Sequence, residues 1–272
     1  MRDLIIIIAL ISLAIGLRLS KGRLCKKLGA FVFVISMGYV GYSITHCWIG
    51  VVGFAILWAL APFLFIYLKN SKKQYPITPR TLKNHSQIDE AFFPHASSYR
   101  VQLEDLGFEN IDEQSWQWLD AQQHHRFLWH PEYNTIASIC LCEQEKIAFC
   151  FIIFYSELAD GTTIKTTNYP FSSPLVHPPH SHWTHVPCEE KHIPAILKTH
   201  RATIQKNNTT PCSVILPDPD SIAEKWCNEL KGQAHYNLSK KLIKSDEEQF
   251  TYTIRGYVYL WAQAMKDFVR LC

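Results

Sequence analysis

The sequence lacks every short motif that would point directly to a common enzyme chemistry. It contains no G-x-x-x-x-G-K-[ST] or G-x-G-x-x-G phosphate-binding pattern, no H-E-x-x-H zinc-protease pattern and no G-x-S-x-G nucleophile elbow. Glycine is scarce, at 11 of 272 residues, so a glycine-rich phosphate loop is not expected. Nucleic-acid binding is not indicated either, because the chain after residue 68 has a small net negative charge and no basic stripe.

Charged residues are missing altogether from one long stretch. Residues 28–68 contain no Asp, Glu, Lys or Arg. A single helix of this length would measure roughly 60 Å, about twice the hydrocarbon thickness of a bilayer, so the stretch predicts two membrane spans. The most polar part of the run, residues 43–47, marks the turn between them and places the spans at about 29–45 and 48–68.

A shorter apolar run at about 4–17 precedes this pair. No small-residue cleavage site follows it, and the next ten residues, 18–27, are strongly basic. We therefore expect an uncleaved first span, with a helix lying in the membrane interface as the alternative. The chain would then have two to three spans within an anchor of residues 1–68.

Basic residues flank the expected hairpin on both sides. Residues 18–27 carry basic side chains and no acidic one, and Lys69, Lys72, Lys73 and Arg80 follow the last span. Because positive flanks remain in the cytoplasm, the sequence predicts a multi-pass membrane protein with the bulk of its chain cytoplasmic. The nine cysteines show no disulfide rhythm, which fits that compartment.

Residues 69–90 are expected to form a linker, followed by a soluble cytoplasmic domain at 91–272. Its clearest pattern is an antiparallel β-meander of three strands, at 135–142, 147–155 and 162–169. The middle strand is continuously apolar and should be covered on both faces, whereas the Thr-rich third strand should have one exposed face. Asp160-Gly161 predicts the second turn.

Amphipathic helices complete the expected domain, so the fold class is α+β. The sequence predicts a short helix ended by Gly107 and another at 189–206, with His200 on its apolar face. A helix capped by Asp218-Pro219 should end at Gly232, with Trp226 and Leu230 buried. Residues 249–255 could add a strand before an aromatic amphipathic helix at 256–271.

A histidine-rich segment offers a candidate metal site at His177, His180, His182 and His185, with Cys188 and His192 nearby. Neutral imidazole and thiolate are natural zinc ligands. The spacing argues against this interpretation, because zinc ligands usually come in pairs from two separated segments. A proline-stiffened polar surface loop is the favoured interpretation of 177–192.

Two smaller groups could carry chemistry. His124, His125 and His130, with Glu132 close by, could supply acid–base groups, although the sequence fixes no nucleophile beside them. Cys140 and Cys142 would face the same way on a strand, where free cysteines are usually small buried apolar residues.

The favoured function is a membrane-anchored, non-catalytic protein whose cytoplasmic domain binds a protein partner or a small ligand, as a sensor, scaffold or complex subunit. It needs no cofactor. The alternative is a membrane-tethered metal-dependent hydrolase that uses zinc on the 177–192 segment. The expected partners are the lipid bilayer and either another protein or a second copy, since Gly38, Gly41, Gly50 and Gly53 would allow close helix approach.

Overall fold

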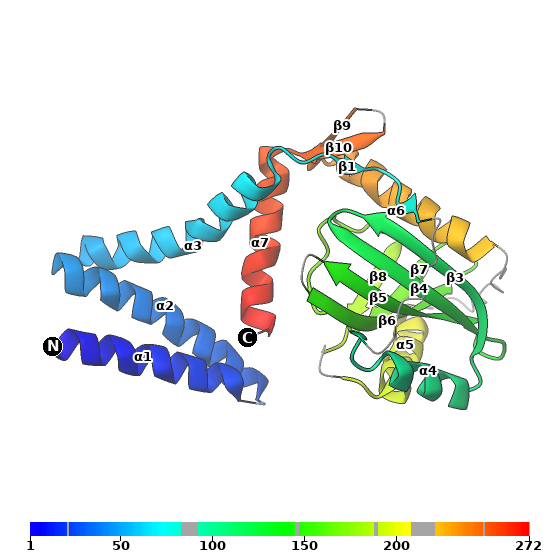
Figure 1. Ribbon diagram of the computed structural model, residues 1–272, viewed down its shortest axis with the longest axis horizontal. Helices are drawn as coiled ribbons and strands as arrows, with labels where there is room; N and C mark the ends of the chain where they lie inside the picture. Colours follow the sequence, from blue (N-terminus) through cyan, green and yellow to red (C-terminus); the bar gives the residue numbers. More distant parts are fainter. Residues whose placement is uncertain are drawn as a thin grey trace. The chain divides into compact units, whose positions relative to one another are not determined.

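The computed structural model describes residues 1–20, 22–82, 92–144, 147–187, 190–207, 221–246 and 248–271 (Figure 1). The side chains of residues 23, 270 and 271 also lie outside this description. Two compact units make up the chain. Unit 1 comprises residues 1–73, 171–174 and 251–272, and unit 2 comprises residues 74–170 and 175–250.

Unit 1 is helical. Its helices are α1 (Arg2–Leu19), α2 (Arg23–Thr45), α3 (Trp48–Asn70) and α7 (Ile254–Leu271). The expected break between the second and third helices is confirmed, because His46 has φ 53° and ends α2 in a left-handed conformation. Two helices, at 24–45 and 48–70, are long and apolar enough to cross a membrane.

The glycines of α2 and α3 serve a contact within the chain. A Cβ atom at Gly50 would lie 2.6 Å from the carbonyl oxygen of Gly41, and one at Gly38 would lie 3.1 Å from Val51 Cγ1. The two backbones can approach this closely only because no side chain stands between them. Gly53, in contrast, has open space around it.

The C-terminal helix belongs to unit 1 as well. The sequence analysis places residues 256–271 in the soluble domain, whereas α7 packs against α2 and α3. Asp267 on α7 also accepts hydrogen bonds from the backbone nitrogen of Ser172 (2.7 Å) and from its hydroxyl (2.6 Å). The division into a membrane anchor and a soluble domain stays a prediction.

Unit 2 is an α+β fold built on a mixed seven-stranded sheet in the order β2-β3-β4-β5-β6-β7-β8. The strands are β2 (Arg80–Thr81), β3 (Glu109–Trp118), β4 (Ala121–His130), β5 (Thr135–Gln144), β6 (Ile147–Glu157), β7 (Thr163–Thr167) and β8 (Ser181–His185). All neighbours are antiparallel except β7 and β8, which are parallel. A small sheet, β1 (Tyr75–Pro76), β10 (Gln249–Tyr252) and β9 (Ile243–Asp246), pairs the two ends of the unit.

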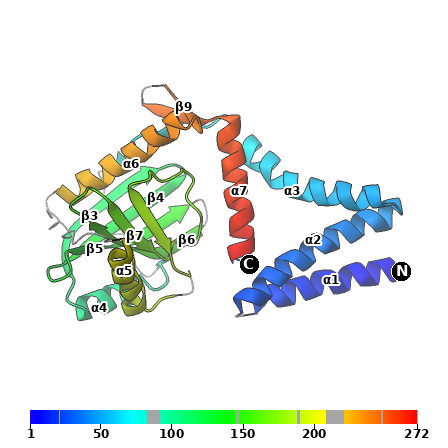
Figure 2. The ribbon, with the colours of Figure 1, turned by 180° about the vertical axis from the view of Figure 1, so that it is seen from behind.

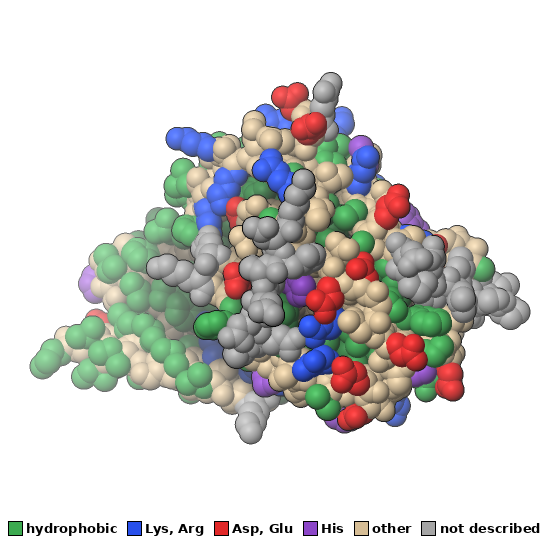
Figure 3. Space-filling view, turned by 45° about the vertical axis from the view of Figure 1, so that its right-hand side comes forward, with side chains coloured by type: hydrophobic (Ala, Val, Ile, Leu, Met, Phe, Trp, Pro, Cys, Tyr) green, Lys and Arg blue, Asp and Glu red, His purple; other side chains and the backbone are tan. Residues whose placement is uncertain are grey.

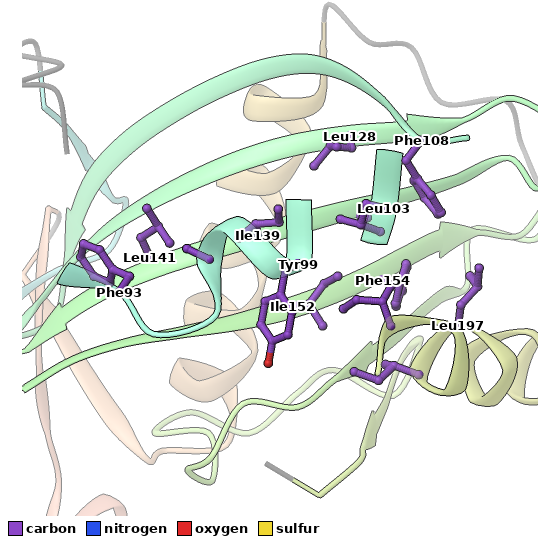
Figure 4. Close-up of a cluster of buried hydrophobic side chains, with 14 residues drawn as sticks. Phe93, Tyr99, Leu103, Phe108, Leu128, Ile139, Leu141, Ile152, Phe154 and Leu197 are labelled. Carbon is purple, nitrogen blue, oxygen red and sulfur yellow. The ribbon is translucent and has the colours of Figure 1, made fainter. Parts of the chain in front are cut away.

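The expected β-meander is confirmed as β5, β6 and β7, with the middle strand covered on both faces. On one face, Ile152 and Phe154 of β6 pack under α4 (Ala96–Asp105) and α5 (Ile193–Asn207) in the core cluster of Figure 4. On the other face, Tyr155 lies 5.9 Å from Trp226 of α6 (Ile222–Ser239), between ring centroids.

The prediction of an exposed face on the third strand is wrong. All five residues of β7 are buried, Thr166 and Thr167 completely so. Both faces are covered, because His200 of α5 contacts Thr166 on one face and Trp226 of α6 contacts Lys165 on the other. Strand β8 pairs along the edge of β7, where the sequence suggests a surface loop. Two of the Thr hydroxyls have partners: Thr167 Oγ1 donates to the carbonyl of Ile152 (2.7 Å), and Thr166 Oγ1 lies 3.0 Å from His200 Nδ1. Thr163 Oγ1 is buried without a partner among the described residues.

The ends of two helices test the predictions made from glycine positions. Gly107 ends α4 as expected, with φ 88°, and the amides of Gly107 and Phe108 donate back to the carbonyls of Glu104 and Leu103. Gly232 does not end a helix, because α6 continues to Ser239. The expected caps Asp218 and Pro219, and Cys188, lie outside the described residues.

Candidate ligand-binding site

A buried lysine occupies the sheet face beneath α6. Lys165 lies on β7, where Thr-rich alternation directs it to the same face as Tyr155 and Trp183, its partners on β6 and β8. Lys165 as a whole is 4% exposed to solvent. A fully buried ammonium is costly unless it is paired, so the surroundings of Lys165 need an explanation.

Three aromatic rings and one carboxylate surround the Lys165 ammonium. Its Nζ lies 5.3 Å from the ring centroid of Tyr155, 4.9 Å from that of Trp183 and 4.4 Å from that of Trp226. It donates to Oε2 of Glu229, three residues after Trp226 on α6. These four partners, together with Lys165, are called the lysine cage below. The cage compensates the buried charge by an ion pair and by cation–π attraction.

A pocket adjoins the lysine cage. It is lined by Asn134, Ile136, Tyr155, Ser156, Glu157, Ile222, Lys225, Trp226 and Glu229. At its rim, Lys225 Nζ donates to Glu157 Oε2 (3.0 Å), and the hydroxyl of Tyr155 donates to the same oxygen (3.3 Å).

Two oxygens of the pocket residues are buried acceptors that have no hydrogen-bond partner among the described residues. They are Oε1 of Glu229 and Oδ1 of Asn134. A buried acceptor without a donor costs free energy, typically about 1–3 kcal/mol. A ligand that donates hydrogen bonds would remove that cost.

The surroundings of the lysine cage keep the hydroxyl of Tyr155 protonated and the imidazole of His177 neutral. Burial, followed by the charges of Glu229 and Glu157, raises the pKa of Tyr155, so its hydroxyl stays protonated and donates. His177 stacks on Trp183 (centroids 4.4 Å, planes 17° apart) and accepts at Nδ1 from Gln233 Nε2 (3.0 Å). Burial and the Lys165 and His185 charges lower the pKa of His177 to about 3.

The four histidines of the candidate metal site do not converge. His177 lies against the lysine cage, while His180, His182 and His185 are exposed. On β8, His182 points to the opposite face of the sheet from Trp183, which is a member of the cage. Within the described part of the chain, no group of three or more His, Cys, Asp or Glu side chains is placed to hold a metal ion. Zinc binding by this segment stays a prediction.

The histidines of β4 bind neighbouring side chains and backbone. His124 Nδ1 lies 2.6 Å from the hydroxyl of Ser115, and its Nε2 lies 3.7 Å from Glu113 Oε2. This arrangement joins a hydroxyl, an imidazole and a carboxylate, but Ser115 is only 4% exposed and His124 9%. His130 Nε2 donates to the carbonyl of Leu106 (2.9 Å) at the end of α4.

Four further side chains singled out by the sequence, His125, Cys140, Cys142 and His200, are buried, whereas His192 is exposed. His125 Nδ1 lies 2.8 Å from Ser138 Oγ, and its Nε2 lies 3.4 Å from Cys140 Sγ. Burial raises the pKa of the Cys140 thiol, and that of Cys142 to about 12, so neither forms a nucleophilic thiolate. His200 is buried and bonded at both nitrogens, to Ser156 (3.1 Å) and Thr166 (3.0 Å), as expected for a satisfied core residue.

Sequence reasoning found Trp226 but missed the other members of the lysine cage. The available signal is a lysine inside a strand that has aromatic residues on the neighbouring strands. A second signal is the spacing of Trp226 and Glu229, which puts them on one side of a helix. Neither signal is decisive without the pairing of β7 with β8, which brings Trp183 to Lys165.

Comparison of the chain with protein-family models, curated proteins and solved structures finds no match.

Proposed function

We propose that the protein is a membrane-anchored binding protein: α2 and α3 cross the bilayer, and unit 2 binds a small hydrogen-bond-donating ligand beside the lysine cage. The observation that carries the anchor is the exposure of α3. Only 6% of its most apolar window is buried within the structure, and Trp48, Ile49 and Phe65 are 79%, 83% and 66% exposed. Hydrophobic side chains gather over these helices in Figure 3. Such a surface is stable in lipid and not in water.

The orientation of the anchor follows from its flanking charges. The basic residues before α2 and after α3 favour the cytoplasm on both sides of the hairpin, with α1 as a further span and the N-terminus across the membrane. Unit 2 is then cytoplasmic. A second copy of the chain or another protein remains a candidate partner of this assembly.

Membrane extraction tests the anchor. The full chain should stay in the membrane pellet after alkaline carbonate washing. Leu57→Arg, at a 63% exposed position of α3, should lower the membrane-integrated fraction, because an arginine at a helix centre costs about 2.5–3.5 kcal/mol on insertion. Ile147→Arg, at a 60% exposed position of unit 2, is the matched control and should integrate like the parent. Release of the parent chain by carbonate would contradict the anchor.

The pocket favours a ligand with hydrogen-bond donors next to an apolar body. Glu229 Oε1 and Asn134 Oδ1 can accept from a donor, and Tyr155 and Trp226 offer aromatic surface. The amino group of an organic amine satisfies both requirements, since a cation is attracted to a ring face and to a carboxylate. The free space of about 10 Å³ admits one such group, so the apolar body of the ligand would lie at the mouth of the pocket. Ser156 of the pocket lies 3.1 Å from His200, but both residues are almost completely buried, so binding is proposed and not catalysis.

Three probes of equal size distinguish the ligand chemistry: benzylamine, benzyl alcohol and benzoate. In thermal unfolding of the full chain in detergent, benzylamine should stabilise the protein most, by about 1.4 kcal/mol at ten times its Kd. Glu229→Gln should abolish this shift, while Glu224→Gln, at an exposed position of α6, should preserve it. Equal shifts for all three probes, or none, would contradict an amine-binding pocket.

A further inference from the structure

The C-terminal helix α7 is fastened to α2 and α3 along one side. The ring of Tyr257 lies 5.1 Å from that of Tyr67, and Trp261 Nε1 donates to the carbonyl of Ala59 (2.7 Å). Near the other end of α7, the Phe268 ring lies 5.3 Å from Trp58. The side of α7 that carries these three aromatic residues is thereby covered by protein.

These contacts place α7 at the open end of the α2–α3 hairpin. Its partners on α3 run from the middle of that helix, at Trp58 and Ala59, to Tyr67 near its end, and Figures 1 and 2 both show α7 lying across the side where α2 and α3 diverge. The guanidinium of Arg18 lies 4.0 Å from the Phe268 ring centroid and donates to the Phe268 carbonyl (3.3 Å). A cation at this position also favours the helix dipole of α7. The open end is the end where the basic flanks of the hairpin begin.

A second apolar strip on α7 is uncovered. Ile254, Val258 and Val269 are 63%, 47% and 42% exposed, and at 100° per residue they lie next to the covered aromatic side. The exposed cations Arg255 and Lys266 lie beyond this strip. Going around α7, the aromatic side packs against α2 and α3, the aliphatic strip next to it is exposed, and the cationic residues beyond the strip are exposed as well. It is the most amphipathic helix that the structure describes.

We propose that α7 lies in the plane of the membrane interface, with the strip of Ile254, Val258 and Val269 in the acyl-chain boundary and Arg255 and Lys266 at anionic lipid headgroups. This inference rests on the proposed membrane anchor and extends it to the C-terminal end of the chain. The helix α7 includes Arg255, Lys266 and Asp267 within its 18 residues and is too charged to span. An aliphatic strip bordered by cations and by Trp and Tyr rings has the composition of an interfacial helix.

A lipid surface fits the open strip better than a second copy of the chain does. The strip is narrow and bordered by cations, so it lacks the broad apolar centre of an obligate protein interface. The cations match the negative charge of cytoplasmic-leaflet lipids. Their long side chains can extend to the headgroups while the aliphatic residues stay in the apolar layer.

Fluorescence quenching in lipid nanodiscs tests the inference on the full chain. A small fluorescent amino acid is introduced by codon suppression at Val258 in the strip, at Lys266 on the cationic edge or, as a reference, at the exposed Leu64 of α3. Each protein is exposed to nitroxide-labelled lipid and, separately, to aqueous iodide. We expect the lipid quencher to act at positions 64 and 258, and iodide to act at position 266.

Each other outcome overturns a defined part of the reasoning. Lipid quenching at position 64 with iodide quenching at 258 would leave the anchor intact and refute the interfacial placement of α7. Protection of position 258 from both quenchers would mean that protein, such as a second copy, covers the strip, and would also refute it. Absence of lipid quenching at position 64 would refute the anchor itself.

A charge variant tests the lipid class. Arg255→Gln combined with Lys266→Gln should reduce lipid quenching at position 258 in nanodiscs that contain anionic lipid, towards the value in neutral nanodiscs. Lys231→Gln, at an exposed position of unit 2, is the matched control and should change nothing. Equal quenching in anionic and neutral nanodiscs for every protein would refute the headgroup contact.

Discussion

The ion pair of the lysine cage makes a strong prediction about non-additive mutations. Three variants are compared with the parent: Lys165→Met, Glu229→Leu and the double substitution. Each single variant leaves one charge of the pair without its partner, whereas the double variant removes both charges and fills the space with apolar atoms of similar size. The contrast between singles and double separates the cost of an unpaired charge from the cost of lost packing.

The magnitudes follow from how deeply each charge is buried. The Lys165 side chain is 5% exposed, so Glu229→Leu strands a cation in an almost dry site, and a loss of about 3–5 kcal/mol is expected. The Glu229 side chain is 26% exposed, so water can solvate part of its charge after Lys165→Met, and a smaller loss of about 1–3 kcal/mol is expected. The double variant should lie within about 1 kcal/mol of the parent.

Denaturant unfolding of the full chain in detergent, followed by tryptophan fluorescence, measures these differences. Trp183 and Trp226 both face the ammonium and should report its loss directly. The expected coupling between the two sites is about 3 kcal/mol or more. Additive losses, with the double variant less stable than either single one, would refute the ion pair as the reason for the cage.

Acid should unfold unit 2 through its buried histidines. Burial lowers the pKa of His200 to about 3, against about 6.5 in an unfolded chain, so the neutral imidazole stabilises the fold fully above pH 6.5. As the pH falls from 6.5 towards 3, the free energy of unfolding should decrease by about 1.4 kcal/mol per pH unit. The denaturant midpoint should therefore fall between pH 7 and 5, and it should fall less steeply in His200→Gln. Gly161 has φ 80° at the β6–β7 turn, so Gly161→Val should destabilise the protein by about 1–3 kcal/mol. Gly232 lies inside α6 with open space around it, so Gly232→Ala should stabilise the protein by about 0.5–1 kcal/mol. Thermal melts in which both variants change in the same direction would contradict these assignments. A fragment of residues 74–250 should unfold cooperatively and stay monomeric in size-exclusion chromatography. A fragment of 75–272 should self-associate, because the aromatic side of α7 has lost its cover on α2 and α3; a monomeric 75–272 fragment would count against that side as an apolar surface.

Much of the secondary structure could be predicted because its causes are local. Helices α2 and α3 follow from an uncharged run too long for one span, and their break follows from the polar residues around His46. The end of α4 follows from the positive φ that Gly107 tolerates. The buried middle strand β6 follows from continuous apolar residues, because a strand with one wet face would alternate.

The rest depends on contacts between distant residues. Strands β3 and β4 carry polar residues such as Glu113 and Gln123, whose hydrogen-bond partners Arg126 and Trp116 lie on the neighbouring strand, so periodicity alone gives no strand signal. Strand β8 lies in a segment rich in Pro and His, and only its parallel pairing with β7 makes it a strand. The same pairing completes the lysine cage, and the helices α5 and α6 bury the two faces of the Thr-rich strand β7. The hydrophobic pattern of one segment does not reveal which distant segment of the chain will pair with it.

The order of synthesis gives the position of α7 a biological consequence. Helices α1 to α3 are translated before unit 2, but the helix that packs against Phe33, Trp58 and Ala59 is translated after it. At roughly 5–20 residues per second, residues 71–253 take on the order of 10–40 seconds, and unit 2 is translated in that interval. A chain that stops before residue 254 lacks the α7 contacts to Phe33, Trp58 and Ala59, so the packing of unit 1 is completed only after unit 2 has been translated.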